Sequence, residues 1–233
     1  MSGGTGASRE QLATDAASVL AAAEIPPSKL GPARRARLTD TERELYFWIL
    51  RRFATTGRPG RAALGEAAAE RGLDVDALLT VLARQDLVHT GRDGEIAVAY
   101  PFSGRPTAHR VGFRGGNEVC AMCAIDALGI APMFDESIEI ASQDPVSGEP
   151  IRVHADPDGA AEWHPRSAVV VAGVSGGDGT ACGGCCQVLN FFVSTGNAEQ
   201  WLAERPDVVG EVISVDDAAE AGRAVFGDVL ERD

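Results

Sequence analysis

All five cysteines of the chain lie in two short clusters. The segment "VCAMCAID" contains Cys120 and Cys123, and the segment "ACGGCCQVLNFF" contains Cys182, Cys185 and Cys186. A thiolate is a nucleophile, and it is also a soft ligand that suits zinc, copper(I) or a heavier metal. An odd number of cysteines excludes a complete set of internal disulfides. In a reducing compartment such clusters indicate a metal site or catalysis.

Asp126 follows the first cluster and is the candidate proton carrier. We expect "NEVCAMCAIDAL" to form an alanine-rich helix that ends at Gly129. Residues three apart share a helix face, so Cys120, Cys123 and Asp126 would form one row. Burial on this apolar helix would favour the protonated carboxyl group. Such a row suits a reaction in which sulfur takes a soft metal while a carbon leaving group takes a proton. The alternative is that Cys120 is a small buried hydrophobe and Asp126 a solvated position.

The second cluster precedes an apolar run, "CQVLNFFVS", that we expect to be a strand. Gly183 and Gly184 allow the backbone to turn tightly or to approach a neighbour closely at this point. Side chains alternate along a strand, so at most one of Cys185 and Cys186 readily faces the same cavity as Cys123.

Zinc is an alternative ligand for these cysteines. Cys120-x2-Cys123 and Cys182-x2-Cys185 have the two-pair form of a tetrahedral four-cysteine site. The 58 residues between the pairs exceed the usual spacing without excluding such a site. On spacing alone, a structural zinc site and a soft-metal reaction site both stay open.

The elements that must position these residues fall into two groups. Residues 1–37 are expected to hold a flexible N-terminus, a helix over 9–24 and a basic linker. Residues 38–103 are predicted to form a winged-helix-like domain, because a capping box at Thr39 begins the first of three helices and Asp74 caps the third. A hairpin around Asp93-Gly94 completes that pattern.

Residues 104–233 are predicted to form a mixed α+β domain with antiparallel strands. Alternating apolar and polar residues predict strands, and helical spacing predicts a helix capped by Asn197 and a closing helix. The expected strands are "ESIEIAS", "PIRVHAD", "SAVVVAGV", "CQVLNFFVS" and "GEVISV", and the expected helices are "NAEQWLAE" and "DDAAEAGRAVFGDVLER". The whole chain is therefore assigned to the α+β class.

Charge and composition limit the partners. A net charge of −13 disfavours nucleic acid as the main partner, although eight arginines within residues 34–61 keep a DNA-binding alternative open. The opening segment "MSGGTGASREQ" lacks the features of a secretion signal, and no apolar run is long enough to span a membrane. We therefore expect a cytoplasmic protein. The histidines match no metal motif and are expected at the surface or in hydrogen bonds: His89, His109, His154 and His164.

Three segments together resemble the organomercurial (alkylmercury) lyase family in order and spacing. They are "CAMCAIDALGIAPMF", "SQDPVSGEPIRVHA" and the long run from "CCQVLNFFVS" to "AGRAVF". The resemblance covers about residues 38–230. Its most specific parts are Cys-Ala-Ile-Asp at 123–126 and Cys-Cys-x-x-x-x-Phe-Phe at 185–192. It implies a winged-helix-type N-terminal domain joined to an α+β catalytic domain.

The resemblance also implies roles. It makes Cys123, Asp126 and Cys185 the catalytic residues, with Cys123 and Cys185 as mercury ligands. By the same match, Cys186 is a neighbouring cysteine of less importance. Cys120 and Cys182 depart from the family pattern, and together with Cys186 they are further candidate ligands for the metal.

The implied reaction is protonolysis of a carbon–mercury bond, which gives a hydrocarbon and bound Hg(II). It requires no organic cofactor, uses external thiols, and delivers its product to those thiols or to a mercuric reductase. Two alternatives remain at this point: a metal-responsive winged-helix regulator that senses through its cysteines, and a zinc-binding four-cysteine domain without catalysis.

Overall fold

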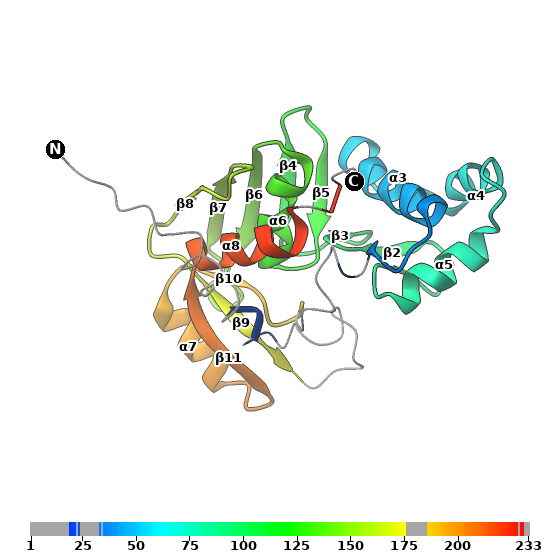
Figure 1. The fold of residues 1–233 in the computed structure, drawn as a ribbon. Coiled ribbons are helices and arrows are strands. Elements are labelled where there is room, and N and C mark those ends of the chain that lie inside the picture. The colour runs from blue at the N-terminus through cyan, green and yellow to red at the C-terminus, as the bar shows by residue number, and fades with distance from the viewer. Residues whose placement is uncertain are drawn as a thin grey trace.

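The structure is a computed structural model that describes residues 35–175 and 186–227, together with residues 19–21, 23, 33 and 229–230. The helix predicted over 9–24 lies largely outside this set, and residues 19–21 are helical. Three helices lie together on one side of the molecule, and the larger α+β part lies on the other (Figure 1).

The first part contains the helices α3 (Asp40–Thr56), α4 (Arg61–Ala69) and α5 (Val75–Arg84). Helix α3 begins at the predicted capping box, in which the Thr39 side chain accepts from the Glu42 N–H and the Glu42 carboxylate accepts from the Thr39 N–H. Asp74 caps α5 as predicted, because its carboxylate accepts from the N–H groups of Asp76 and Ala77.

A hairpin follows the helices, as predicted. Strands β1 (Val88–Thr90) and β2 (Ile96–Ala99) are antiparallel, and Gly94 in the turn has a φ of 77°. Strand β2 also pairs with β3 (Phe102–Ser103), where Ala99 lies opposite Phe102. The hairpin is therefore continuous with the sheet of the second part.

That sheet has eight strands in the order β1-β2-β3-β5-β4-β6-β7-β8, and all neighbours are antiparallel. The predicted hairpin of β6 and β7 is confirmed, with Ile140 opposite Val153. Alternate residues of both strands are buried beneath the helices. The remaining bounds are β4 (Arg110–Phe113), β5 (Glu118–Ala121), β6 (Ile138–Gln143), β7 (Pro150–Ala155) and β8 (Ala161–His164).

A second sheet has β9 (Val169–Ser175) at its centre, with β10 (Phe191–Phe192) and β11 (Val208–Ser214) antiparallel on either side. Helix α7 (Thr195–Ala203) packs against it through Trp201, whose ring meets Phe192 edge-on. The predicted cap at Asn197 is wrong, because the helix starts earlier and Ser194 accepts from the Asn197 N–H. The predicted strand over "CQVLNFFVS" is also too long, since residues 186–188 form a turn and β10 holds two residues.

Helices α6 (Ala124–Phe134) and α8 (Val215–Phe226) cross in front of the large sheet (Figure 1). They approach closely at two glycines: a Cβ on Gly129 would lie 2.4 Å from the Phe226 ring, and one on Gly222 would lie 2.8 Å from the Gly129 nitrogen. The prediction that Gly129 ends a helix is wrong. This glycine lies inside α6 because the crossing leaves no room for a side chain.

The two parts share one hydrophobic core. Phe53 of α3 stacks on Phe102 of β3 with ring centroids 5.2 Å apart. The Asn117 side chain, at the start of β5, donates to the carbonyl groups of Phe53 and Ala54 at 3.0 and 2.7 Å. Within the described residues, none of the helices has the length and apolar character needed to cross a membrane.

Candidate active site

Cys123 is the N-cap of α6. Strand β5 ends at Ala121, and two residues later the extended backbone of Cys123 (φ −154°, ψ 179°) turns into the helix. Its Sγ accepts from the backbone N–H of Asp126 at 3.3 Å, which is the bond that a serine or threonine cap usually makes. The positive end of the helix dipole therefore lies against this sulfur and stabilises a thiolate.

The Asp126 side chain also contacts the Cys123 sulfur. Its Oδ2 accepts from the Cys123 thiol at 3.1 Å and from the Cys186 thiol at 3.5 Å. One carboxylate oxygen thus faces both sulfurs, and the three ligand atoms lie within 4.8 Å of one another. Such a group can bind a soft cation through sulfur while an oxygen beside it accepts or donates a proton.

Cys186 reaches this position on a short turn. The Asn190 side chain donates to the carbonyl groups of Gln187 and Val188, which closes the turn on itself. The turn is attached to the start of α6, because the Ala124 N–H donates to the Leu189 carbonyl at 2.9 Å. The N-terminus of α6 therefore holds both thiols. Cys123 is its N-cap, and the N–H of Ala124, its first residue, holds the Cys186 turn.

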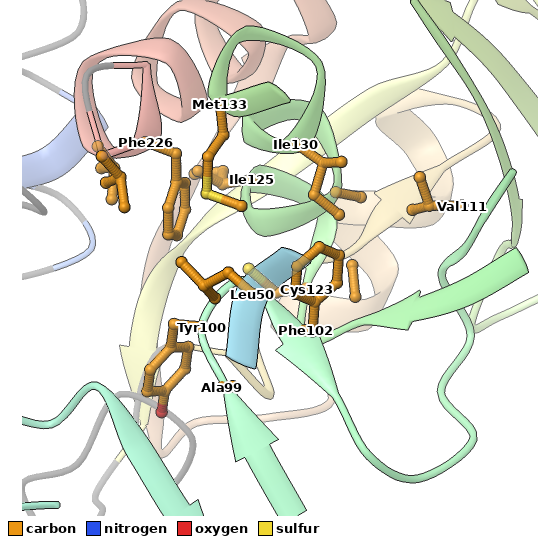
Figure 2. Close-up of a cluster of buried hydrophobic side chains, with 14 of the residues drawn as sticks. Leu50, Ala99, Tyr100, Phe102, Val111, Cys123, Ile125, Ile130, Met133 and Phe226 are labelled. Atoms are coloured by element: carbon orange, nitrogen blue, oxygen red, sulfur yellow. The ribbon is translucent and has the colours of Figure 1, made fainter. Parts of the chain in front are cut away.

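The surroundings of the site are apolar. Cys123, Asp126 and Cys186 are 1%, 6% and 7% exposed, so bulk water barely reaches them. Figure 2 shows Cys123 among buried apolar side chains that include Leu50 of α3 and Phe102 of β3. In such a low-dielectric setting the charge on a thiolate or a carboxylate acts strongly on its neighbours.

Cys120 does not join this group. It lies in strand β5, half-buried, with Arg110 and Ser103 as cross-strand partners. The predicted helical row of Cys120, Cys123 and Asp126 is therefore wrong, because the helix begins after Cys123. The zinc alternative needs Cys182 and Cys185, which lie outside the described residues, so the four-cysteine arrangement stays a prediction; among the described cysteines, Cys123 and Cys186 gather at Asp126.

Cys182 and Cys185 lie outside the described residues, so the roles predicted for them stay predictions. Cys186, which the family resemblance ranked below Cys185, is the described cysteine of the second cluster, and it lies beside Asp126. The alternation of side chains along a strand did not decide which of Cys185 and Cys186 faces Cys123. The turn at 186–188 then brings Cys186 to the site, and a strand pattern did not anticipate a turn there.

Two further buried polar residues, His109 and Asp144, were not predicted from the sequence to belong to a site. His109 is 2% exposed, its Nδ1 lies 3.0 Å from Ser142 Oγ, and burial lowers its pKa to about 4 although a hydrogen bond to Asn190 acts to raise it. The signal was present, since His109, directly before β4, begins the alternation of buried residues that Val111 and Phe113 continue. Asp144 is likewise buried, and the backbone N–H of Val193 donates to it.

Comparison with known proteins decides the family. The family model of alkylmercury lyases (MerB) matches residues 102–227, which is more than half of the chain and contains the whole Cys123–Asp126–Cys186 group. The chain belongs to the alkylmercury lyase family. An alkylmercury lyase of Staphylococcus epidermidis is 30% identical over 158 residues, which are 68% of this chain and 71% of that protein.

Other alkylmercury lyases match more narrowly. One from Bacillus cereus is 35% identical over 118 residues, or 51% of this chain, and the match spans about half (53%) of that protein's length. A crystal structure of the mercury-bound form of MerB2 superposes with a TM-score of 0.68 and 21% identity, covering 96% of this chain and all of that one. The likeness to MerB2 supports the mixed α+β fold with antiparallel sheets.

Proposed function

We propose that the protein is an organomercurial lyase, which cleaves the carbon–mercury bond of an organomercury compound into a hydrocarbon and Hg(II). One observation carries the proposal: a single oxygen of Asp126 faces the thiols of both Cys123 and Cys186 at a buried helix N-terminus. Membership of the alkylmercury lyase family supports the same reaction.

The first step is attack of sulfur on mercury. Cys123 passes its proton to Asp126 Oδ2, 3.1 Å away, and the thiolate displaces the counter-ligand of R–Hg–X. The helix N-terminus favours this thiolate because its N–H groups and dipole carry partial positive charge. The products of the step are a Cys123–Hg–R adduct, X⁻, and a protonated Asp126.

The second step breaks the bond to carbon. Cys186, 3.5 Å from the same oxygen, adds its sulfur to mercury, and the added electron density weakens the mercury–carbon bond. Asp126 delivers its proton to the departing carbon and then receives the proton of Cys186. The net change converts R–Hg–X and two thiols into R–H, HX and Hg(II) held by two thiolates.

The second sulfur is proposed to be Cys186, on the strength of its position. Cys185 stays the candidate that the sequence resemblance named for that role. We propose that external thiols or a mercuric reductase remove the Hg(II), since two thiolates in an apolar pocket retain a soft ion until a competing thiol takes it. A reducing, cytoplasmic location fits a site that depends on reduced thiols.

We propose that the winged-helix-like segment is a scaffold for the site rather than a DNA reader. Leu50 of α3 contributes to the apolar wall near Cys123, as Figure 2 shows. Several arginines of the segment are occupied within the protein: Arg43 pairs with Asp40, Arg61 pairs with Asp76, and the Arg52 guanidinium lies over a tryptophan ring. These partners leave less positive charge for a phosphate backbone.

The test is hydrocarbon release. Purified reduced protein with excess small thiol is mixed with phenylmercury, and benzene is measured by gas chromatography, with Cys123→Ser as the inactive control. We expect several benzene molecules per protein molecule. Tight Hg(II) binding without benzene would exclude the lyase and support a sensor, and stoichiometric zinc whose removal unfolds the chain would support a structural zinc domain.

A further inference from the structure

We propose that His109 is a positioning residue that joins the two halves of the two-thiol site and sets the spacing of Cys123 and Cys186. The inference rests on the proposed function only in that it takes these thiols as the mercury ligands. His109 acts on the two sulfurs through the segments that carry them.

The backbone of His109 is attached to the Cys123 half. Its carbonyl group accepts from the Ala121 N–H at 2.9 Å, and Ala121 is two residues before Cys123. The Thr107 hydroxyl donates to the Ala121 carbonyl at 2.7 Å, so both polar groups of that residue are held. The strand end that leads into the α6 cap is therefore fixed directly beside His109.

The side chain of His109 is attached to the Cys186 half. It lies beside Asn190, the residue whose amide closes the Cys186 turn. The imidazole also meets the ring of Phe191 edge-on, with centroids 5.8 Å apart. On its other side, Nδ1 lies 3.0 Å from Ser142 Oγ in β6.

These contacts suit an imidazole in its neutral form, which burial favours. The Asn190 Nδ2 group already donates to two carbonyl groups, so the amide oxygen remains for the ring. A neutral histidine donates with one ring nitrogen and accepts with the other, and the Ser142 hydroxyl can donate to the accepting nitrogen, which satisfies a partner on each side. An apolar replacement would leave the buried Ser142 hydroxyl and the half-buried Asn190 amide oxygen without these bonds, and that loss would release the turn.

The consequence concerns metal geometry. Hg(II) bound by two protein thiolates needs both sulfurs at a fixed separation, whereas binding by one thiolate does not. If the 186–190 segment moves away from α6, Cys123 keeps its cap on the helix while Cys186 leaves the pocket. Loss of His109 should therefore change the second ligand selectively.

The experiment maps which thiols one Hg(II) ion protects. The reduced full-length protein receives one equivalent of HgCl₂, is alkylated, and is digested for peptide mass spectrometry, which reads each cysteine separately. In the unmodified protein we expect Cys123 and Cys186 to be protected together. In His109→Leu we expect Cys123 to stay protected and Cys186 to alkylate at least ten-fold faster.

Three further variants make the test specific. His109→Gln keeps a donor and an acceptor and should restore at least part of the Cys186 protection. Asn190→Ala removes the partner on the turn and should reproduce the His109→Leu pattern, which covers the case in which His109→Leu does not fold. His154→Leu, on the exposed side of β7, is the matched control and should behave as the unmodified protein.

The outcomes separate this inference from the lyase proposal. Joint protection of both cysteines in a folded His109→Leu or Asn190→Ala protein would overturn the positioning role. Failure of His109→Gln to improve on His109→Leu would also overturn it, because bulk alone would then explain the effect. If no hydrocarbon is released but protection follows His109 as expected, the lyase proposal fails and the positioning role stands.

Discussion

Asp126 Oδ2 faces two thiols, and this shared contact determines what single substitutions should do. Sulfur supplies the affinity for mercury, whereas the carboxyl group supplies the proton for carbon. Binding and bond cleavage therefore depend on different atoms, and they can be separated by replacing one residue at a time.

Asp126→Asn should keep mercury binding and lose bond cleavage. The amide neither accepts the Cys123 proton nor delivers one to carbon, so turnover should fall by roughly 10²- to 10⁴-fold, the scale of a positioned general acid. Benzene release measures turnover, and mass spectrometry of the intact protein measures bound mercury. Loss of mercury binding in this variant would mean that the carboxylate is itself an indispensable ligand.

Cys186→Ser should abolish turnover, as should Cys123→Ser. A serine hydroxyl neither ionises near neutral pH nor binds mercury comparably, so the bond to carbon is not weakened by a second sulfur. Cys120→Ser is the matched control and should retain most activity, because Cys120 lies in β5 outside the group. Full activity of Cys186→Ser together with an inactive Cys185→Ser would return the second ligand to Cys185.

The buried His109 should make stability depend on pH. Its pKa falls from 6.5 to about 4 in the folded protein because of burial, with partial opposition from the Asn190 hydrogen bond. The unfolded chain therefore takes up the proton first, and stability that is complete above pH 6.5 is lost as the pH falls toward 4. The free energy of unfolding should decrease by about 3 kcal/mol over that window.

Urea unfolding at a series of pH values checks this, with His109→Gln as the comparison. The difference in stability between the two proteins should shrink as the pH falls, since glutamine does not titrate. A pH-independent difference would show that His109 does not titrate in this way. Asp144 does not confuse the result, because hydrogen bonds hold its pKa below 3.8 against the opposing effect of burial, so its contribution is lost at lower pH.

At the scale of residues, the sequence predicted the chemistry of the site better than the geometry of the site. The spacing of Cys123 and Asp126 pointed to one thiol–carboxyl pair, and the two residues do meet. They meet as a helix cap and its third residue rather than on a helix face, because the chain stays extended through residue 121. Propensity could not locate that boundary, since the alanine-rich segment favours a helix throughout.

At the scale of elements, the β6–β7 hairpin holds the segment that follows the Cys186 turn. Asp144 Oδ1 accepts from the N–H groups of Val146 and Ser147 inside the hairpin. Its Oδ2 accepts from the Val193 N–H and the Asn197 side chain at 2.7 and 3.0 Å. One carboxylate thus ties the hairpin to the end of β10 and the start of α7.

Asp144→Asn should destabilise the protein by roughly 2–3 kcal/mol. The NH₂ group of asparagine would face N–H groups that now donate to the Asp144 carboxylate. Those hydrogen bonds to a charged acceptor would be lost. Urea unfolding gives the magnitude. Asp158→Asn is the control, because its carboxylate is exposed and accepts from the Ala160 N–H within its own turn. Equal losses in the two variants would contradict the proposed tie.

Most strands and helices were predictable from sequence, and some ends were not. The β6–β7 hairpin and the cap at Asp74 follow from local patterns, which is why they were found. The turn at 186–188 is held by contacts with Ala124, more than sixty residues away in the chain, so no local pattern reveals it. The end of α6 was missed for a similar reason. Gly129 leaves room for the close approach of α8 and does not end its own helix.

At the scale of the molecule, the crossing of α6 and α8 fixes the helix that carries the site. A Cβ on Gly222 would lie 2.8 Å from the Gly129 nitrogen and 2.9 Å from the Ile125 carbonyl oxygen, and neither backbone atom can move cheaply. Gly222→Ala should therefore destabilise the protein by about 1–3 kcal/mol in urea unfolding. Ile125 precedes Asp126, so turnover should fall as well.

Gly65→Ala is the matched control, because α4 has room for a side chain at this position. Its Cβ would meet one atom, Val75 Cγ1, at 3.9 Å, so alanine should stabilise α4 by about 0.5–1 kcal/mol. A neutral or stabilising effect of Gly222→Ala would mean that the crossing is looser than described.

The arrangement of the strands was beyond sequence analysis. The hairpin was predicted to complete a winged-helix-like segment, and it does follow three helices as expected. Its continuation through β3 into β5 could not be read from local patterns, because β3 has two residues and pairs with a strand that comes later in the chain than its neighbour β4. Strand pairing of this kind depends on tertiary packing and not on local sequence preference.

Cys186 follows Asp126 by sixty positions, and strands β6 to β9 lie between them. A ribosome that adds about 5–20 residues per second therefore produces Cys123 and Asp126 roughly 3–12 s before Cys186. During that interval a nascent chain offers mercury the Cys123 thiol before Cys186 has been added and before the fold covers the site. An organomercurial that arrives then can be captured but not cleaved, so newly synthesised chains are the ones most exposed to the poison.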